Sequence, residues 1–138
     1  MPARFIKNED GTALVLVAVL MVGLMGCAAL VIDVGTMYST KAKLQKAADA
    51  AALAAARKLP NISAAITTAE NYAELNGVEG SEITATTPYD GDAARIEVVC
   101  ARNVSYTFAR VLGFTDIDIS ARGGEKILSM GRRGLTFY

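Results

Sequence analysis

The chain lacks histidine altogether among its 138 residues. This absence excludes Ser-His-Asp and Cys-His catalytic sites, the HExxH zinc site and histidine-ligated haem. There is also no CxxC pair and no GxxxxGK[ST] phosphate-binding loop. The sequence therefore indicates no catalytic residues, no cofactor-binding residues and no metal ligands, and it predicts a protein that is not an enzyme.

The chain has only two cysteines and no net charge. Cys27 lies in an apolar run and Cys100 in a strand-like segment, so we interpret both as small apolar residues rather than as a disulfide. Fourteen basic and fourteen acidic residues cancel. Because nucleic-acid binding needs a clustered basic face, the sequence does not favour a nucleic-acid partner.

Charge is missing over one long stretch. Between Asp10 and Asp33 there is no charged side chain, and Thr12 to Ile32 reads TALVLVAVLMVGLMGCAALVI. A helix needs about 20 apolar residues to cross the hydrocarbon core of a bilayer, whereas the apolar part of a signal peptide has only about 7–15. The run therefore predicts a transmembrane helix, with membrane lipid as its surroundings.

The helical pattern continues beyond this run to Lys58, where Pro60 must stop it. A helix from Thr12 to Lys58 would be about 70 Å long. Its second half is amphipathic and is expected to pack on its own domain or on a neighbouring subunit. The apolar residues at helical spacing are Val34, Met37, Tyr38, Leu44, Ala48, Ala51, Ala52 and Ala55.

The rest of the chain predicts a small head. Asn61 or Ser63 caps a second helix that ends at Asn76-Gly77. Residues 82–87 and 94–101 alternate partly and flank turn residues that include Asp90 and Asp92, which favours a hairpin.

Two further elements complete the head. Residues 103–112 predict a short helix, and residues 115–121, which alternate strictly, predict a third strand. Glycines from Gly123 onward predict a loosely ordered end. The expected fold class is α+β, in the order α-α-β-β-α-β.

These observations divide the chain into five segments. Residues 1–11 form an N-terminal segment, 12–32 the transmembrane helix, 33–59 its extension, 60–127 a small α/β head and 128–138 a loose tail.

The N-terminal half resembles a known family. Gly11, the apolar run and the sequence VIDVGTMYSTKAKLQKAADAAALAAARKL are similar to the start of TadE/TadG-like proteins of bacterial tight-adherence (Flp) pilus assembly. Residues 106–127 also resemble the short helix and closing strand of such proteins. The positions that carry the resemblance are Gly11, Asp33, Leu44, Gln45, Ala48, Asp49, Ala50, Ala51, Ala52, Leu53 and Ala54.

The sequence departs from the family in two respects. It is too short for the von Willebrand-type domain of larger members. Prepilin-like members carry Glu five residues after the processing glycine, whereas Leu16 stands there in this chain and Glu9 precedes the glycine. The chain is therefore expected to keep its anchor together with the residues before Gly11.

The resemblance implies a non-catalytic, membrane-anchored, pilin-like component of a tight-adherence pilus or a related secretion apparatus. It implies a single-pass protein of the bacterial cytoplasmic membrane, with a cytoplasmic N-terminus and the head outside. Its partners would be other pilus-assembly or pilin-like subunits, and it could form a homo-oligomer. Lys41, Lys43 and Lys46 outnumber Arg4 and Lys7, so the charge count alone slightly disfavours that orientation.

Two alternatives stay open beside this reading. One is a filament-forming subunit with its apolar helices bundled in a fibre core, and the other is a membrane-tethered enzyme or ligand-binding head.

Asp33 is the residue for which the sequence leaves two roles. A carboxylate at the end of a transmembrane run either marks the membrane boundary or docks an assembly partner. The resemblance places Asp33 in the matched motif, and we expect partner docking there. The candidate docking residues are Asp33, Leu44, Gln45 and Asp49.

Overall fold

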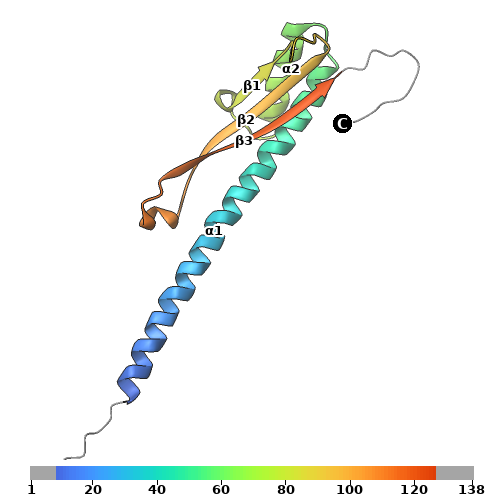
Figure 1. Cartoon of the computed structure of the whole chain (residues 1–138). Coiled ribbons are helices and arrows are strands. Elements are labelled where there is room, and N and C mark those ends of the chain that lie inside the picture. Colours follow the sequence, from blue (N-terminus) through green and yellow to red (C-terminus); the bar gives the residue numbers. More distant parts are fainter. Residues whose placement is uncertain (1–8, 127–138) are drawn as a thin grey trace, which may run out of the picture.

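The protein is built on one long helix. The computed structural model describes residues 9–126, and in it α1 runs without interruption over Glu9–Ala56, for 48 residues (Figure 1). The large apolar side chains of the first half of α1, from Leu14 to Ile32, are exposed, and the body of the head lies beside the second half (Figure 1). This helix is long and apolar enough to cross a membrane, and none of its most apolar stretch is buried in the protein. The predicted long N-terminal helix is therefore confirmed.

The head is assembled on the C-terminal half of α1. Helix α2 spans Ile62–Leu75, and Asn61 caps it by accepting a hydrogen bond from the Ala64 amide. A short 3-10 turn, η1, covers Gly80–Glu82, and a second, η2, covers Ala109–Leu112. The three strands are β1 (Ile83–Thr86), β2 (Arg95–Ser105) and β3 (Asp116–Lys126).

The strands form one antiparallel sheet in the order β1-β2-β3. Strands β2 and β3 pair along their whole length, from Arg95 with Lys126 to Ser105 with Asp116. This long hairpin extends from the head along α1 toward its apolar half (Figure 1). Residues 106–115, here called the tip loop, join the two strands at that end.

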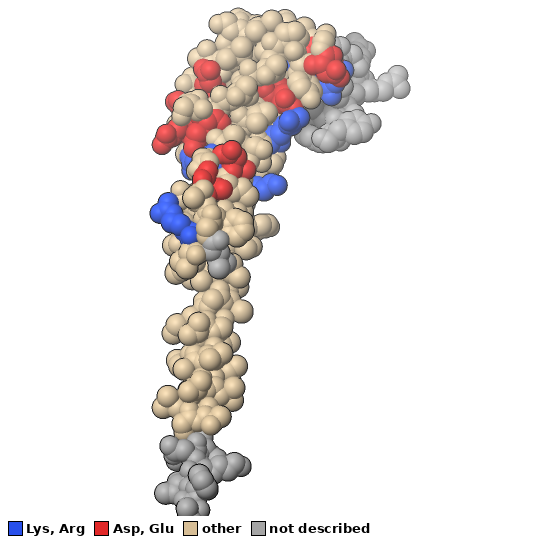
Figure 2. Space-filling model, turned by 60° about the vertical axis from the view of Figure 1, so that its left-hand side comes forward, with Lys and Arg blue, Asp and Glu red and all other residues tan. Residues whose placement is uncertain are grey.

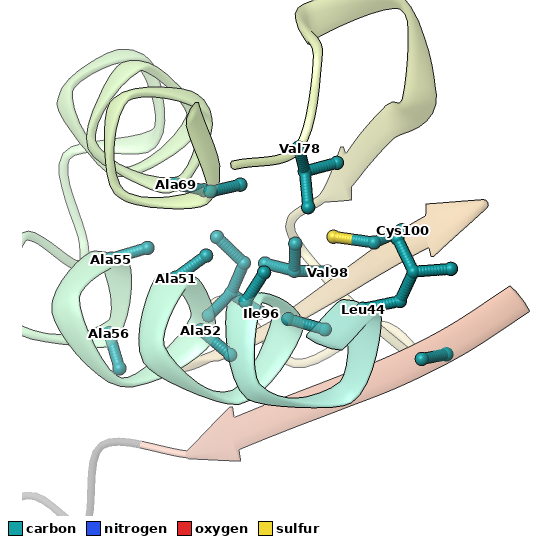
Figure 3. Packing of buried hydrophobic residues seen from close by; sticks show 14 of the residues in the cluster. Leu44, Ala51, Ala52, Ala55, Ala56, Ala69, Val78, Ile96, Val98 and Cys100 are labelled. Atoms are coloured by element: carbon teal, nitrogen blue, oxygen red, sulfur yellow. The ribbon is translucent and has the colours of Figure 1, made fainter. Parts of the chain in front are cut away.

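The core lies between the helices and one face of the sheet. Ile96, Val98 and Cys100 alternate along β2 and point toward α1 and α2 (Figure 3). The helices contribute mostly alanines, which let the two helices and the sheet approach closely because they add little volume. The buried residues of α1 and α2 in this cluster are Leu44, Ala47, Ala48, Ala51, Ala52, Ala55, Ala56, Ala65, Ala69 and Ala73.

The expected buried face of α1 is only partly correct. The residues from Leu44 onward are buried as expected, and Met37 packs against the cluster. Val34 and Tyr38, in contrast, are 63% and 78% exposed. Asp33 and Met37, each one residue earlier, are packed at the same level of α1, so Val34 and Tyr38 are exposed because they lie on another side of the helix.

The predicted α+β class is confirmed, but two elements differ. The expected helix over 103–112 is only the η2 turn, because Asn103 to Ser105 continue β2 by pairing with β3. The expected third strand over 115–121 extends to Lys126, so Gly123 and Gly124 are ordered strand residues. Their neighbours on β2, Val98 and Glu97, hold them in register. The segments 1–8 and 127–138, including the expected tail, lie outside the described residues.

An ion pair connects η1 to the sheet. Arg102 donates from Nε to Oε1 of Glu82 and from Nη2 to Oε2, both at 2.6 Å, and Nη2 also reaches the carbonyl of Gly77. The hydrogen bonds from Arg102 hold the pKa of Glu82 below its ordinary value. Glu82 also accepts a hydrogen bond from the Glu79 amide, which fixes the connection between α2 and β1.

Gly123 is where β3 approaches α1 most closely. A Cβ added there would lie 2.5 Å from the carbonyl oxygen of Ala48, whereas one added at Gly124 would meet nothing nearer than 4.0 Å. We therefore expect Gly123→Ala to lower the stability of the head by about 1–3 kcal/mol, because the backbone of β3 or α1 must shift.

Gly124→Ala is the matched control for this prediction. Denaturant unfolding of the full chain in detergent, followed by circular dichroism, should show a lower midpoint for Gly123→Ala and little change for Gly124→Ala. Equal midpoints for the two variants would contradict the close contact.

Candidate functional site

Asp33 is buried although it carries a charge. It follows the last residue of the apolar run directly, and only 4% of its surface is exposed. Its carboxylate accepts hydrogen bonds from three consecutive backbone amides of the tip loop. The Oδ1 atom lies 3.0 Å from the Thr107 nitrogen, and Oδ2 lies 3.0 Å from that of Phe108 and 2.7 Å from that of Ala109.

The tip loop presents these amides because it is closed by its own hydrogen bonds. The Tyr106 amide donates to the Thr115 carbonyl at 3.2 Å, and the Phe114 amide donates to the Ala109 carbonyl at 3.3 Å. Gly113 ends η2 with a φ of 93°, a left-handed conformation that favours glycine. The rings of Tyr106 and Phe114 pack edge to face, with their centroids 6.3 Å apart. The amides before and at the start of η2 are thus left without partners in the loop, and Asp33 satisfies them.

The Asp33 contact joins parts of the chain that are 74 to 76 residues apart. Hydrogen bonds to a carboxylate are roughly twice as strong as those between neutral groups. Both oxygens of Asp33 are engaged, so the contact fixes the tip loop at one height along α1. We call this contact the Asp33 latch.

The other three candidate residues lie closer to the C-terminal end of α1, in the part that packs on the sheet. Leu44 is 1% exposed and belongs to the core. The amide nitrogen of Gln45 donates to the Arg122 carbonyl and to Oδ1 of Asp49, both at 2.9 Å. Gln45 is half-buried and Asp49 is exposed. These residues hold α1 against β3 one residue before the close approach of Gly123 to Ala48.

The structure therefore does not gather the four candidates into one cluster. Asp33 and Leu44 are separated by about 16 Å along the helix, at 1.5 Å per residue. Gln45 bonds β3 and Asp49, Leu44 lies in the core, and Asp33 bonds the tip loop. The expectation that they dock a partner stays a prediction, and Asp33 and Leu44 would act on a partner indirectly, through the surfaces they hold in place.

Sequence reasoning considered a boundary marker or a docking contact for Asp33 and missed the intramolecular latch. Thr107, Phe108 and Ala109 were missed as its partners because a backbone amide leaves no signature in a sequence. The one available signal was the cost of a carboxylate beside a lipid-facing run, which requires hydrogen-bond donors close by.

The hydrogen bonds of the latch attach the tip loop to α1. Within residues 9–126 no group of three metal-ligating side chains occurs, and no buried side-chain nitrogen or oxygen lacks a hydrogen-bond partner. Cys27 is exposed on the apolar half of α1, and Cys100 is buried in the core. Burial, with a smaller contribution from Glu82, raises the pKa of the Cys100 thiol, which keeps it protonated and unreactive.

Comparison with known proteins identifies one part of the chain. Residues 11–58 match the family model described as putative Flp pilus-assembly TadE/G-like. This match confirms the resemblance seen in the sequence, and it coincides with α1 and the turn after it. Neither the curated proteins nor the solved structures gave a significant match.

The latch makes a specific prediction about the tip loop. Asp33→Asn keeps the shape of the side chain but removes the charge and replaces one acceptor oxygen by a donor, so the amides of Thr107, Phe108 and Ala109 lose much of their pairing. Hydrogen exchange of these amides, measured by NMR on the full chain in detergent, should become faster. The amides of Val98 and Cys100 in the sheet should keep their rates. Unchanged exchange at all three loop amides would contradict the latch.

Proposed function

Because the α1 segment of the chain is TadE/G-like, we propose that the protein is a non-catalytic, membrane-anchored, pilin-like component of a bacterial tight-adherence pilus assembly or a related secretion apparatus. The observation that carries the proposal is the coincidence of the family match with a helix that has two different halves. One half exposes its large apolar side chains, and the other half forms one wall of the head's core.

The dimensions of α1 support a single membrane crossing. The 21 residues from Thr12 to Ile32 correspond to about 30 Å of helix, which is the thickness of the hydrocarbon core of a bilayer. The first charged residue after them, Asp33, is engaged by the latch. Lys41, Lys43 and Lys46 follow on the next turns and are suited to the aqueous side of the interface. On the face seen in Figure 2, the apolar half of α1 carries no charged side chain, and the charged side chains lie over the head.

A filament-forming subunit is the second candidate. It is favoured by the same observation that the apolar half of α1 is exposed all around, since such a surface can be covered by neighbouring helices as well as by lipid. The two functions differ in what releases the protein from cells. An anchored assembly component should require detergent, whereas a filament subunit should appear in extracellular fibres removed by shearing.

Partner docking in this proposal uses surfaces that the four candidate residues hold in place. Asp33 fixes the tip loop, and Gln45 and Asp49 lie at the seam between α1 and β3. Leu44 supports that seam from the core.

The proposed orientation predicts a protease result. With the N-terminus in the cytoplasm and the head outside the membrane, protease added to intact spheroplasts should digest the head. A cytoplasmic marker protein should remain intact in the same sample as the control. A head that is fully protected would overturn the proposed orientation.

The docking role of Asp33 is tested in cells. We expect Asp33→Asn to insert and accumulate like the parent while co-purification of assembly partners and surface piliation fall, because the tip loop is no longer fixed. Glu70→Gln, which also removes one carboxylate charge but on the exposed face of α2, is the matched control and should behave like the parent. Normal piliation by Asp33→Asn at parental protein levels would defeat the docking role.

A further inference from the structure

The tip loop exposes large apolar side chains to an unusual degree. Val111 is 89% exposed, Phe114 60% and Phe108 43%. All three lie within seven residues of one another, on a loop whose conformation is fixed by its own hydrogen bonds and by Asp33. Single exposed apolar residues are common on proteins, but a rigid group of them indicates a contact surface.

The latch sets the position of this group relative to the apolar half of α1. The tip loop is bonded to the helix at the residue immediately after Ile32, where the apolar run ends. In Figure 1 the β2–β3 hairpin is the part of the head that extends furthest toward the apolar half of α1, and the tip loop is its end. When α1 spans a bilayer, the tip loop therefore lies at the bilayer surface.

The backbone of the tip loop is suited to that environment. Amides that cannot reach water must be paired within the protein. The amides from Thr107 to Ala109 are paired with Asp33, and those of Val111, Gly113 and Phe114 donate to carbonyls of the loop itself. The loop can therefore enter a region of low water content without leaving these groups unsatisfied.

Charge around the loop is mixed and does not attract it to an acidic surface. Arg110 is exposed on η2, and Asp116 and Asp118 lie at the start of β3, where the side-chain amide of Asn103 donates to both. Hydrogen bonds from Thr115 and Asn103 hold the pKa of Asp116 below its ordinary value, so it stays ionised. Apolar contact, rather than attraction to anionic headgroups, would drive the association.

We infer that the tip loop is a second membrane contact, in which Phe108, Val111 and Phe114 insert into the interfacial region of the same bilayer that α1 spans. This inference rests on the membrane anchoring in the proposed function. The Asp33 latch then sets the depth of the loop in the membrane. Together, the loop and α1 hold the head at a fixed tilt relative to the membrane.

The absence of tryptophan from the chain allows a direct test. Single-tryptophan variants of the full chain are reconstituted in phosphatidylcholine vesicles, with and without lipid that carries a spin label close to the headgroup. For Phe114→Trp we expect emission at shorter wavelength than in water and a loss of intensity with the labelled lipid. The loss should persist in high salt and should not require anionic lipid.

Two further variants separate the possible outcomes. Tyr89→Trp lies at the opposite end of β2, about 30 Å from the tip loop, and should not be quenched. Leu20→Trp lies within the apolar run and should be quenched by lipid labelled deep in the acyl chains. If Leu20→Trp is quenched and Phe114→Trp is quenched no more than Tyr89→Trp, the tip-loop contact is overturned while anchoring stands.

Two other results would also contradict the tip-loop contact. If Leu20→Trp is not quenched, membrane anchoring itself fails, and the tip-loop contact fails with it. If Phe114→Trp shifts to shorter wavelength without quenching, and the shift depends on the ratio of protein to lipid, a second protein copy covers the loop and the lipid contact is overturned.

Discussion

The architecture depends on the small-residue face of α1. Alanines from Ala47 to Ala56 leave enough room for α2 and the sheet to pack directly against the helix backbone. The tightest point is Gly123, whose neighbour in space is the carbonyl of Ala48. Larger side chains on α1 would move β3 outward, and with it the hairpin that carries the tip loop. One helix can therefore combine two roles. Its first half carries large apolar side chains suited to lipid, and its second half carries mostly alanines and forms a wall of the core.

The Asp33 latch fixes the hairpin a second time, at the end of the apolar run of α1. Strands β2 and β3 are fixed at the head by the core and by the bond from Gln45 to the Arg122 carbonyl. At their other end the tip loop is fixed by three amides that donate to one carboxylate. A hairpin held at both ends cannot slide or swing freely along α1. The head thus keeps one orientation relative to the helix, which is the property that an assembly component needs if its partners are to meet the same surface each time.

The TadE/G-like match and the geometry divide the chain in the same way. The matched residues 11–58 include every α1 residue discussed for docking, whereas the chain beyond α1 contributes the tip loop and the whole sheet. Positions that the family resemblance singled out have definite structural tasks here. Asp33 pairs loop amides, Leu44 fills the core, Gln45 binds β3 and Ala48 admits Gly123. The motif from which partner binding is predicted therefore also makes the contacts that attach the head to α1.

The sequence by itself determined the long helix, its apolar half, the second helix and the α+β class, because apolar periodicity, helix propensity and chain-breaking residues act locally. The start of α2 at Asn61 and the pairing of β1 with β2 followed from the same local signals. Only the tertiary structure decided that Asn103 to Ser105 continue β2, that Gly123 is a packed strand residue, and that Val34 and Tyr38 stay outside the core. The latch belongs to this second group: Asp33 and its partners are more than 70 residues apart, and the partners are backbone amides, which every residue except proline has.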